Sequence, residues 1–297
     1  MNDRKKKRSL ISFDWAIKRL LRSKVDFIIL EGFLSELLKV NVRIKNILES
    51  ESNKTDKDDR HNKCDLLCEN DRGELIIIEV QFHREMDYFQ RMLYATSKVI
   101  SEYIAAGEKY AEVKKLYSIN ILYFDLGQGD DYLYKGETNF RGLRNSDRLR
   151  LSSTQVKTFG KDYPSDLYPE YYLIKVNNFD DVAKNSLDQW IYYLKNSELP
   201  PTNITAKGLD KVKERFKYDK MDATQKKEYD QYLESLRASD SAIETAKYEA
   251  KEEAISKKNM EVIVNSFNEG LDIPKIAKII AESEEEVKRI LQDKGLL

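Results

Sequence analysis

Residues 63–82 hold the pattern that most constrains the fold of this chain. Two apolar runs, at 64–68 and 75–82, flank a polar stretch that reads ENDRG. Polar residues followed by Gly are typical of a tight turn, so the two runs are predicted to pair as a β-hairpin. The second run is almost uniformly apolar and β-branched, as expected for a strand that is buried on both faces. We therefore expect a sheet that is centred on this hairpin.

Two acidic residues interrupt these apolar runs. Because side chains alternate along a strand, Ile77, Glu79 and Gln81 are predicted to share one face. Folding back at the turn brings Asp65, at the start of the first run, close to Glu79. Two neighbouring carboxylates in an apolar sheet are costly unless something compensates their charge, and a divalent cation with oxygen ligands would do so. The alternative is an edge hairpin whose acids face solvent, which suits Asp65 better than Glu79.

This arrangement resembles the PD-(D/E)xK nuclease superfamily. Its motif is an Asp at a strand end followed by acid-x-Lys on the next strand. Here the second half reads Glu79-Val80-Gln81, with Gln in place of Lys. That variant resembles the Rpn-like branch of recombination-promoting nucleases and transposases. The resemblance implies an α/β, restriction-endonuclease-like core, with a central mixed β-sheet between helices.

Other segments resemble the same family in the same order along the chain, over roughly the first two hundred residues. They comprise an N-terminal helical motif, a second helical motif, a helix followed by a strand, and a closing strand and helix. The matching residues are Phe13, Lys18, Leu20, Phe33, Leu34, Leu37, Leu38, Arg91, Tyr94, Gly107, Tyr110, Val113, Ile119, Ile121, Leu122, Ile174, Val176, Phe179, Trp190 and Leu194.

The resemblance implies metal-dependent hydrolysis of DNA phosphodiester bonds. Asp65, Glu79 and the Val80 carbonyl would hold Mg²⁺ (or Mn²⁺), and Gln81 would orient the attacking water. Gln carries no charge and cannot act as a general base near neutral pH. Three explanations stay open: a nearby lysine, Lys63 or Lys98, compensates; the metal does most of the activation; or the activity is low.

An additional acid from the N-terminal helices is expected by the same resemblance. Glu31 is the first candidate and Glu36 the second, and the spacing does not choose between them. Either could instead be a helix charge exposed to solvent.

Residues 86–106 are predicted to form one long helix with two distinct faces. Met86, Phe89 and Leu93 begin an apolar stripe that continues to residue 104. Arg91, Tyr94 and Lys98 share roughly the opposite face, which could be solvated or could contact DNA phosphates together with Lys63.

The bulk charge places a limit on how such a chain binds DNA. It has 51 basic and 52 acidic residues and a net charge of −1, so any DNA affinity must come from local basic patches. No apolar run is long enough for a membrane span, and no small-molecule cofactor is expected. With two cysteines only, we expect a reducing, cytoplasmic compartment.

Three segments are expected along the chain. Residues 9–201 would form the nuclease-like domain, with weak strands at 132–134 and 155–159. Residues 202–258 are dense in charge and are predicted to form a helical linker. Residues 259–297 resemble a small helix-turn-helix-like module. Its last helix begins with three Glu, which would repel phosphates, so packing or self-association into a homo-oligomer is expected there rather than DNA reading.

A rival function comes from another class of protein. The substitution at Gln81 would suit a catalytically weak or inactive nuclease fold that acts as a DNA- or partner-binding module. Retention of both carboxylates, Asp65 and Glu79, favours the nuclease. The family name also suggests a part in DNA recombination or transposition.

Overall fold

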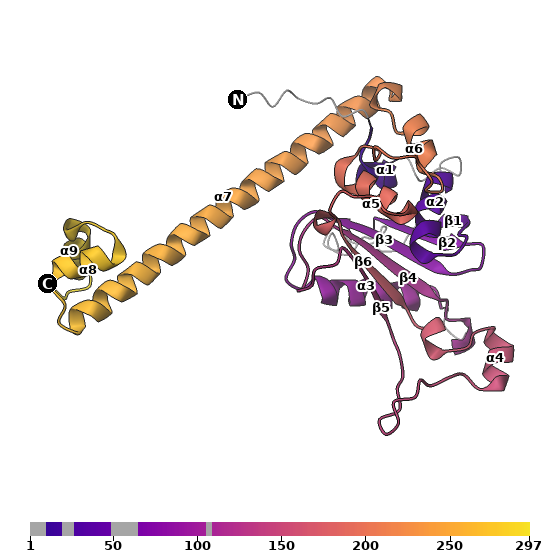
Figure 1. The fold of residues 1–297 in the computed structure, drawn as a ribbon, viewed down its shortest axis with the longest axis horizontal. Coiled ribbons are helices and arrows are strands. Elements are labelled where there is room, and N and C mark those ends of the chain that lie inside the picture. Colours follow the sequence, from indigo (N-terminus) through magenta and orange to yellow (C-terminus); the bar gives the residue numbers. More distant parts are fainter. Residues whose placement is uncertain (1–9, 20–26, 49–64, 105–108) are drawn as a thin grey trace. The chain divides into compact units, whose positions relative to one another are not determined.

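The computed structural model describes residues 10–19, 27–48, 65–104 and 109–297, and they form a mixed α/β fold (Figure 1). Its six-stranded sheet has the order β1-β2-β3-β4-β6-β5. The strands β3, β4 and β6 run parallel, whereas β1, β2 and β5 pair antiparallel with their neighbours. The strand bounds are β1 Ile44–Leu48, β2 Leu66–Asn70, β3 Leu75–Gln81, β4 Leu116–Leu122, β5 Leu133–Glu137 and β6 Glu170–Lys175.

The central hairpin forms as the sequence predicts. Strands β2 and β3 pair antiparallel, with Leu66 opposite Ile78 and Glu69 opposite Leu75. Gly73 adopts a φ of 76° in the turn, a left-handed conformation that glycine reaches without steric cost. The expected fold class, a mixed sheet with flanking helices and a helical C-terminal region, is confirmed.

Helices cover both faces of the sheet. Figure 1 shows α1 (Phe13–Arg19), α2 (Phe27–Leu38), α5 (Ser186–Asn196) and α6 (Leu209–Arg215) on one side, and α3 (Tyr88–Glu102) on the other. On the first side, Phe33 and Trp190 pack edge to face at 5.6 Å. On the second, Val99 of α3 packs in a buried cluster with Ile77.

The inward face of α3 differs from the expected one. Met86, Phe89 and Leu93 are exposed at 85%, 47% and 59%, so the expected apolar stripe is wrong over its first half. Tyr88, Thr96 and Val99 are the residues that turn inward. The reason lies in the sheet face beneath, which is polar at the start of this helix and therefore accepts polar side chains there.

The segment 155–159 is a helix, so the expected weak strand there is wrong. α4 (Ser153–Phe159) begins at Ser152, whose hydroxyl accepts from the Gln155 backbone N–H while the Gln155 side chain caps the Ser152 N–H. Gly160 ends the helix with a φ of 63°. This reciprocal capping stabilises the helix more than the few apolar residues could stabilise a strand.

The first compact unit ends at Ala223, beyond the expected boundary at residue 201. Leu209, Val212 and Phe216 are fully buried, and the Phe216 carbonyl accepts from the Ile11 N–H at 2.7 Å. The charge-rich region after residue 201 therefore contains a helix, α6, that packs on the first unit.

The second unit, Thr224–Leu297, contains three helices. α7 (Ala223–Asn268) is one continuous helix of 46 residues, which continues past the expected linker boundary at 258. α8 (Ile273–Ile280) and α9 (Glu284–Asp293) pack with its end around Ile263. Within the described residues, none of the helices has the length and apolarity that a membrane crossing requires.

Candidate functional site

The site is built at the carboxyl end of β3, where the hairpin opens. The last strand pair before the site joins Leu66 to Ile78, and the same register continued by one residue would set Asp65 opposite Glu79. The Asp65 Oδ2 accepts a hydrogen bond from the Val80 N–H at 2.8 Å, which fixes the carboxylate against the strand. Opposed residues in an antiparallel pair point to the same face. A register continued in this way would bring the two acids together on one face, and both are half-buried.

Gln81 continues this face into a short polar chain. Its side-chain amide donates to Glu85 Oε1 at 2.6 Å. The same carboxylate oxygen accepts from Arg91 of α3, also at 2.6 Å. Glu85 therefore links the strand that carries Glu79 to the helix that covers it.

Tyr88 lies beneath this chain and is buried. Its hydroxyl donates to Asn120 Oδ1 of the neighbouring strand β4 at 2.9 Å. Burial raises the pKa of Tyr88, and the negative charges of Glu79, Glu85 and Asp65 raise it further. Tyr88 therefore keeps its proton and acts as a hydrogen-bond donor at this site.

Arg91 remains charged although it is half-buried. Burial alone would lower its pKa, but its hydrogen bond to Glu85 and the nearby charges of Glu79 and Glu85 raise the pKa above its usual value. Arg91 also lies 6.0 Å from the centre of the Tyr88 ring. A permanent cation thus stands within electrostatic reach of the Asp65–Glu79 pair.

The donor set suits a hard divalent cation. Asp65 and Glu79 offer carboxylate oxygens and Val80 a carbonyl, the ligand types that Mg²⁺ prefers. Among the described residues no third His, Cys, Asp or Glu completes a cluster. Two carboxylates are sufficient for Mg²⁺ in proteins, since water and substrate phosphate fill the remaining positions.

The structure does not bring the expected additional acids to this pair. Glu31 accepts from the Ile44 N–H at 2.8 Å, and Ile44 pairs with Asn70 at the far end of β2. Asn70 is five residues from Asp65, or about 16 Å along a strand. Glu36 accepts from the Ser186 hydroxyl at 2.5 Å and holds α2 to α5.

The remaining predicted residues have different outcomes. Arg91 reaches the site, whereas Tyr94 is 53% exposed on α3 and Lys98 is half-buried further along that helix. Lys63 lies outside the described residues. The sequence analysis missed Glu85, Tyr88 and Asn120, because Glu85 stands in a short connection, Tyr88 begins a helix whose inward face was expected to be apolar, and Asn120 lies in an apolar strand. A polar Asn inside such a strand was the one available sign.

Comparison with known proteins finds a family match in the first half of the chain. Residues 11–147 match a family model described as PD-(D/E)XK nuclease family transposase. Neither the comparison with curated proteins nor that with solved structures finds a match. The matched segment contains the hairpin, both carboxylates and α3. Over residues 11–147, the chain is therefore similar to the PD-(D/E)XK nuclease family transposases.

Proposed function

We propose that this protein is a metal-dependent DNA endonuclease that acts in recombination or transposition. The observation that carries the proposal is the hydrogen bond from Val80 N–H to Asp65, which sets Asp65 beside Glu79 at the end of β3. The family of residues 11–147 supports phosphodiester hydrolysis as the chemistry and DNA as the substrate.

Asp65, Glu79 and the Val80 carbonyl are the residues that would hold the cation. Bound there, Mg²⁺ or Mn²⁺ would polarise the phosphate and lower the pKa of an attacking water. The protein's contribution is to keep both carboxylates on one face. The Val80 N–H restrains the first, and the paired strand restrains the second.

Gln81 and Arg91 take the roles that a lysine has in the wider superfamily. The Gln81 amide nitrogen is held by Glu85, which leaves its carbonyl oxygen to accept a hydrogen bond from the attacking water. Gln81 cannot remove the proton, so it orients the water only. Arg91 supplies the positive charge, and its placement beside Glu79 allows it to stabilise charge that develops on the phosphate.

Nicking of a supercoiled plasmid tests this function. We expect nicking with Mg²⁺ or Mn²⁺ and none with EDTA, and loss of nicking in Asp65→Asn and in Glu79→Gln. Glu69→Gln is the matched control, because Glu69 is a carboxylate of β2 that pairs with Lys114 at 2.8 Å, near the turn end of the hairpin. Nicking at the wild-type rate by the Asp65→Asn, Glu79→Gln double variant would place the chemistry elsewhere.

A DNA-binding module without catalysis is the second candidate. The observation that favours it is the polar chain from Gln81 through Glu85 to Arg91, which satisfies these groups with one another. Such a protein would bind DNA and show no nicking with either Mg²⁺ or Mn²⁺. Wild-type nicking that is lost in Glu79→Gln would exclude this candidate.

A further inference from the structure

A basic segment outside the proposed cleavage site joins β5 to the end of α4. Between the end of β5 at Glu137 and the helix-ending Gly160, the chain has five Arg and Lys residues against one Asp, a net charge of +4. The whole chain has a net charge of −1. We call residues 138–160 the basic arm.

The basic arm begins as a two-stranded ribbon that projects from the sheet. Strand β5 is the edge strand, and Figure 1 shows the chain continuing beyond it to a narrow loop before it returns to α4. Arg141 and Arg148 pair as an antiparallel bridge, and the Leu149 N–H donates to the Phe140 carbonyl at 2.9 Å. The Gly142 N–H closes the tip on Asp147 O at 2.9 Å.

The arginines at the tip of the ribbon have no acidic partner. Within the described part of the chain, neither Arg141 nor Arg144 forms an ion pair, and both are exposed. Leu143 stands between them with its side chain fully exposed, at 103%. A surface of this kind presents positive charge with one apolar group at its end.

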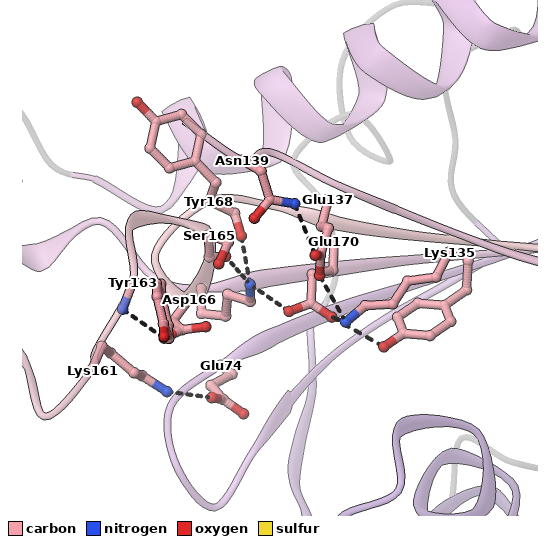
Figure 2. Close-up of polar contacts among 12 residues, drawn as sticks. Glu74, Lys135, Glu137, Asn139, Lys161, Tyr163, Ser165, Asp166, Tyr168 and Glu170 are labelled. Atoms are coloured by element: carbon pink, nitrogen blue, oxygen red, sulfur yellow. Dashed lines mark hydrogen bonds and ion pairs between the residues drawn. The ribbon is translucent and has the colours of Figure 1, made fainter. Parts of the chain in front are cut away.

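The base of the basic arm is fixed by a buried polar network. Lys115 is buried and donates to the Ser165 carbonyl at 2.9 Å, the Tyr168 carbonyl at 2.6 Å and Glu170 Oε1 at 2.9 Å. Figure 2 shows these contacts, with Lys135 between Glu137 and Glu170 on the other side. The carboxylates next to the ribbon are thereby neutralised by lysines of the sheet.

The return strand of the ribbon is held by the same network. Arg148 stacks on the Tyr163 ring at 4.0 Å and donates to the Ser165 hydroxyl at 2.8 Å. Because Ser165 is also bonded to Lys115, the ribbon is connected to the core. The tip arginines are therefore presented from a fixed base, which lowers the entropic cost of binding a partner.

We propose that the basic arm binds duplex DNA through its ribbon, with Arg141 and Arg144 on the phosphates and Leu143 in the groove. A two-stranded ribbon fits the major groove, and apolar side chains commonly contact base edges. The partner's identity as DNA rests on the proposed function, whereas its polyanionic character follows from the charge.

The basic arm contacts DNA at a distance from the proposed cleavage site. Glu137 pairs with Glu170, and the strand register aligns Glu170 with Ile76 of β3 across the sheet. Ile76 is three residues before Glu79. Three residues along the strand and three strand spacings give about 17 Å between the base of the ribbon and Glu79. At 3.4 Å per base pair, the contacted phosphates lie roughly five or more base pairs from the cleaved one.

Binding of a labelled 30-base-pair duplex in EDTA, measured by fluorescence anisotropy at several salt concentrations, tests the proposal without cleavage. Each phosphate contact contributes about 0.9 to the log–log salt slope. The double variant Arg141→Ala, Arg144→Ala should therefore lower the magnitude of the salt slope by about 1.8. At 0.1 M salt this corresponds to a roughly 60-fold loss of affinity. Leu143→Ala should weaken binding with the slope unchanged.

Two control variants separate the ribbon from general charge. Arg141→Lys, Arg144→Lys keeps the charge and should keep the salt slope. Lys213→Ala, Lys220→Ala removes two exposed cations elsewhere on the first unit and should leave affinity near the wild-type value. A similar loss in this control, or wild-type affinity in Arg141→Ala, Arg144→Ala, would overturn the proposal.

Two further outcomes are distinguishable. If the arginine variant loses binding to double-stranded RNA while duplex DNA binding is unchanged, the partner is RNA and the proposal fails. If wild-type protein shows no metal-dependent nicking but the arginine variant still loses DNA affinity, the proposed function fails and the DNA-binding role of the basic arm stands.

Discussion

Replacing Phe216 by Ala should destabilise the first unit strongly, although this residue follows a charge-rich stretch. Its side chain is 1% exposed, and it lies among the buried residues that α6 and the segment before α1 contribute. Deletion of a buried Phe side chain leaves a cavity and costs about 3–5 kcal/mol. The backbone bond from the Ile11 N–H to the Phe216 carbonyl is retained in the variant, so this loss comes from packing alone.

Thermal unfolding followed by tryptophan fluorescence measures this loss in the intact chain. Trp15 and Trp190 are the only tryptophans, and both are buried in the first unit. For a unit of this size, the loss corresponds to a fall in the melting temperature of about 10 °C. Tyr248→Ala is the control, because Tyr248 is 65% exposed on α7 and its removal should shift the midpoint little. A midpoint within about 2 °C of wild type for Phe216→Ala would show that α6 is not packed on the core.

Three other changes have distinct expected results. A chain ending at Ala223 should be soluble and folded, whereas one ending at Pro201 should aggregate because α6 is lost. Equal solubility of the two truncated chains would show that the first unit does not need α6. Arg91→Ala should lower the nicking rate by about 100-fold, since it removes the cation proposed to stabilise charge on the phosphate, and Arg91→Lys should retain more activity. Equal rates for Arg91→Ala and wild type would assign Arg91 to structure only. Burial opposes ionisation of Glu170, but the hydrogen bonds and charges of Lys115 and Lys135 together outweigh it and hold the pKa of Glu170 below its usual value. The stability from this carboxylate is therefore present above the unfolded pKa, about 4.5, and is lost as pH falls through the lower folded value. Glu170→Gln lacks it throughout, so its melting temperature should fall less than that of wild type between about pH 5 and pH 3, and parallel curves would contradict this.

The sequence predicted the hairpin because it follows from local rules. Alternation placed Glu79 and Gln81 on one face, and the turn set Asp65 near them. Contacts that depend on the packing of distant elements were not predictable in the same way. Glu85 bridges Gln81 and Arg91 only because α3 lies over the end of β3.

Hydrophobic spacing failed on α3 for a physical reason. The apolar residues Phe89 and Leu93 have helical periodicity, and periodicity alone favours burying them. The sheet face below carries Glu79 and Asn120, so the helix turns Tyr88 and Arg91 toward it instead. Polar chemistry at the site therefore decided the orientation of the helix.

Charge density concealed structure in the second half of the chain. The segment after residue 201 is rich in Lys, Glu and Asp, which is typical of solvated helices. A short helix such as α6 needs only a few apolar residues to pack, here Leu209, Val212 and Phe216. A helix was also missed at α4. Reciprocal capping hydrogen bonds between Ser152 and Gln155 stabilise this helix, which the apolar content of the segment did not predict.

Stabilisation of the protein by a divalent cation tests most directly whether Asp65 and Glu79 share one. At a Mn²⁺ concentration of 100 times the Kd, binding adds about 2.7 kcal/mol and should raise the melting temperature by about 5–10 °C. Asp65→Asn and Glu79→Gln should each abolish this shift. Glu31→Gln should retain it, because Glu31 bonds the Ile44 N–H at the other end of β2. An unchanged shift in the Asp65→Asn, Glu79→Gln double variant would contradict the metal site.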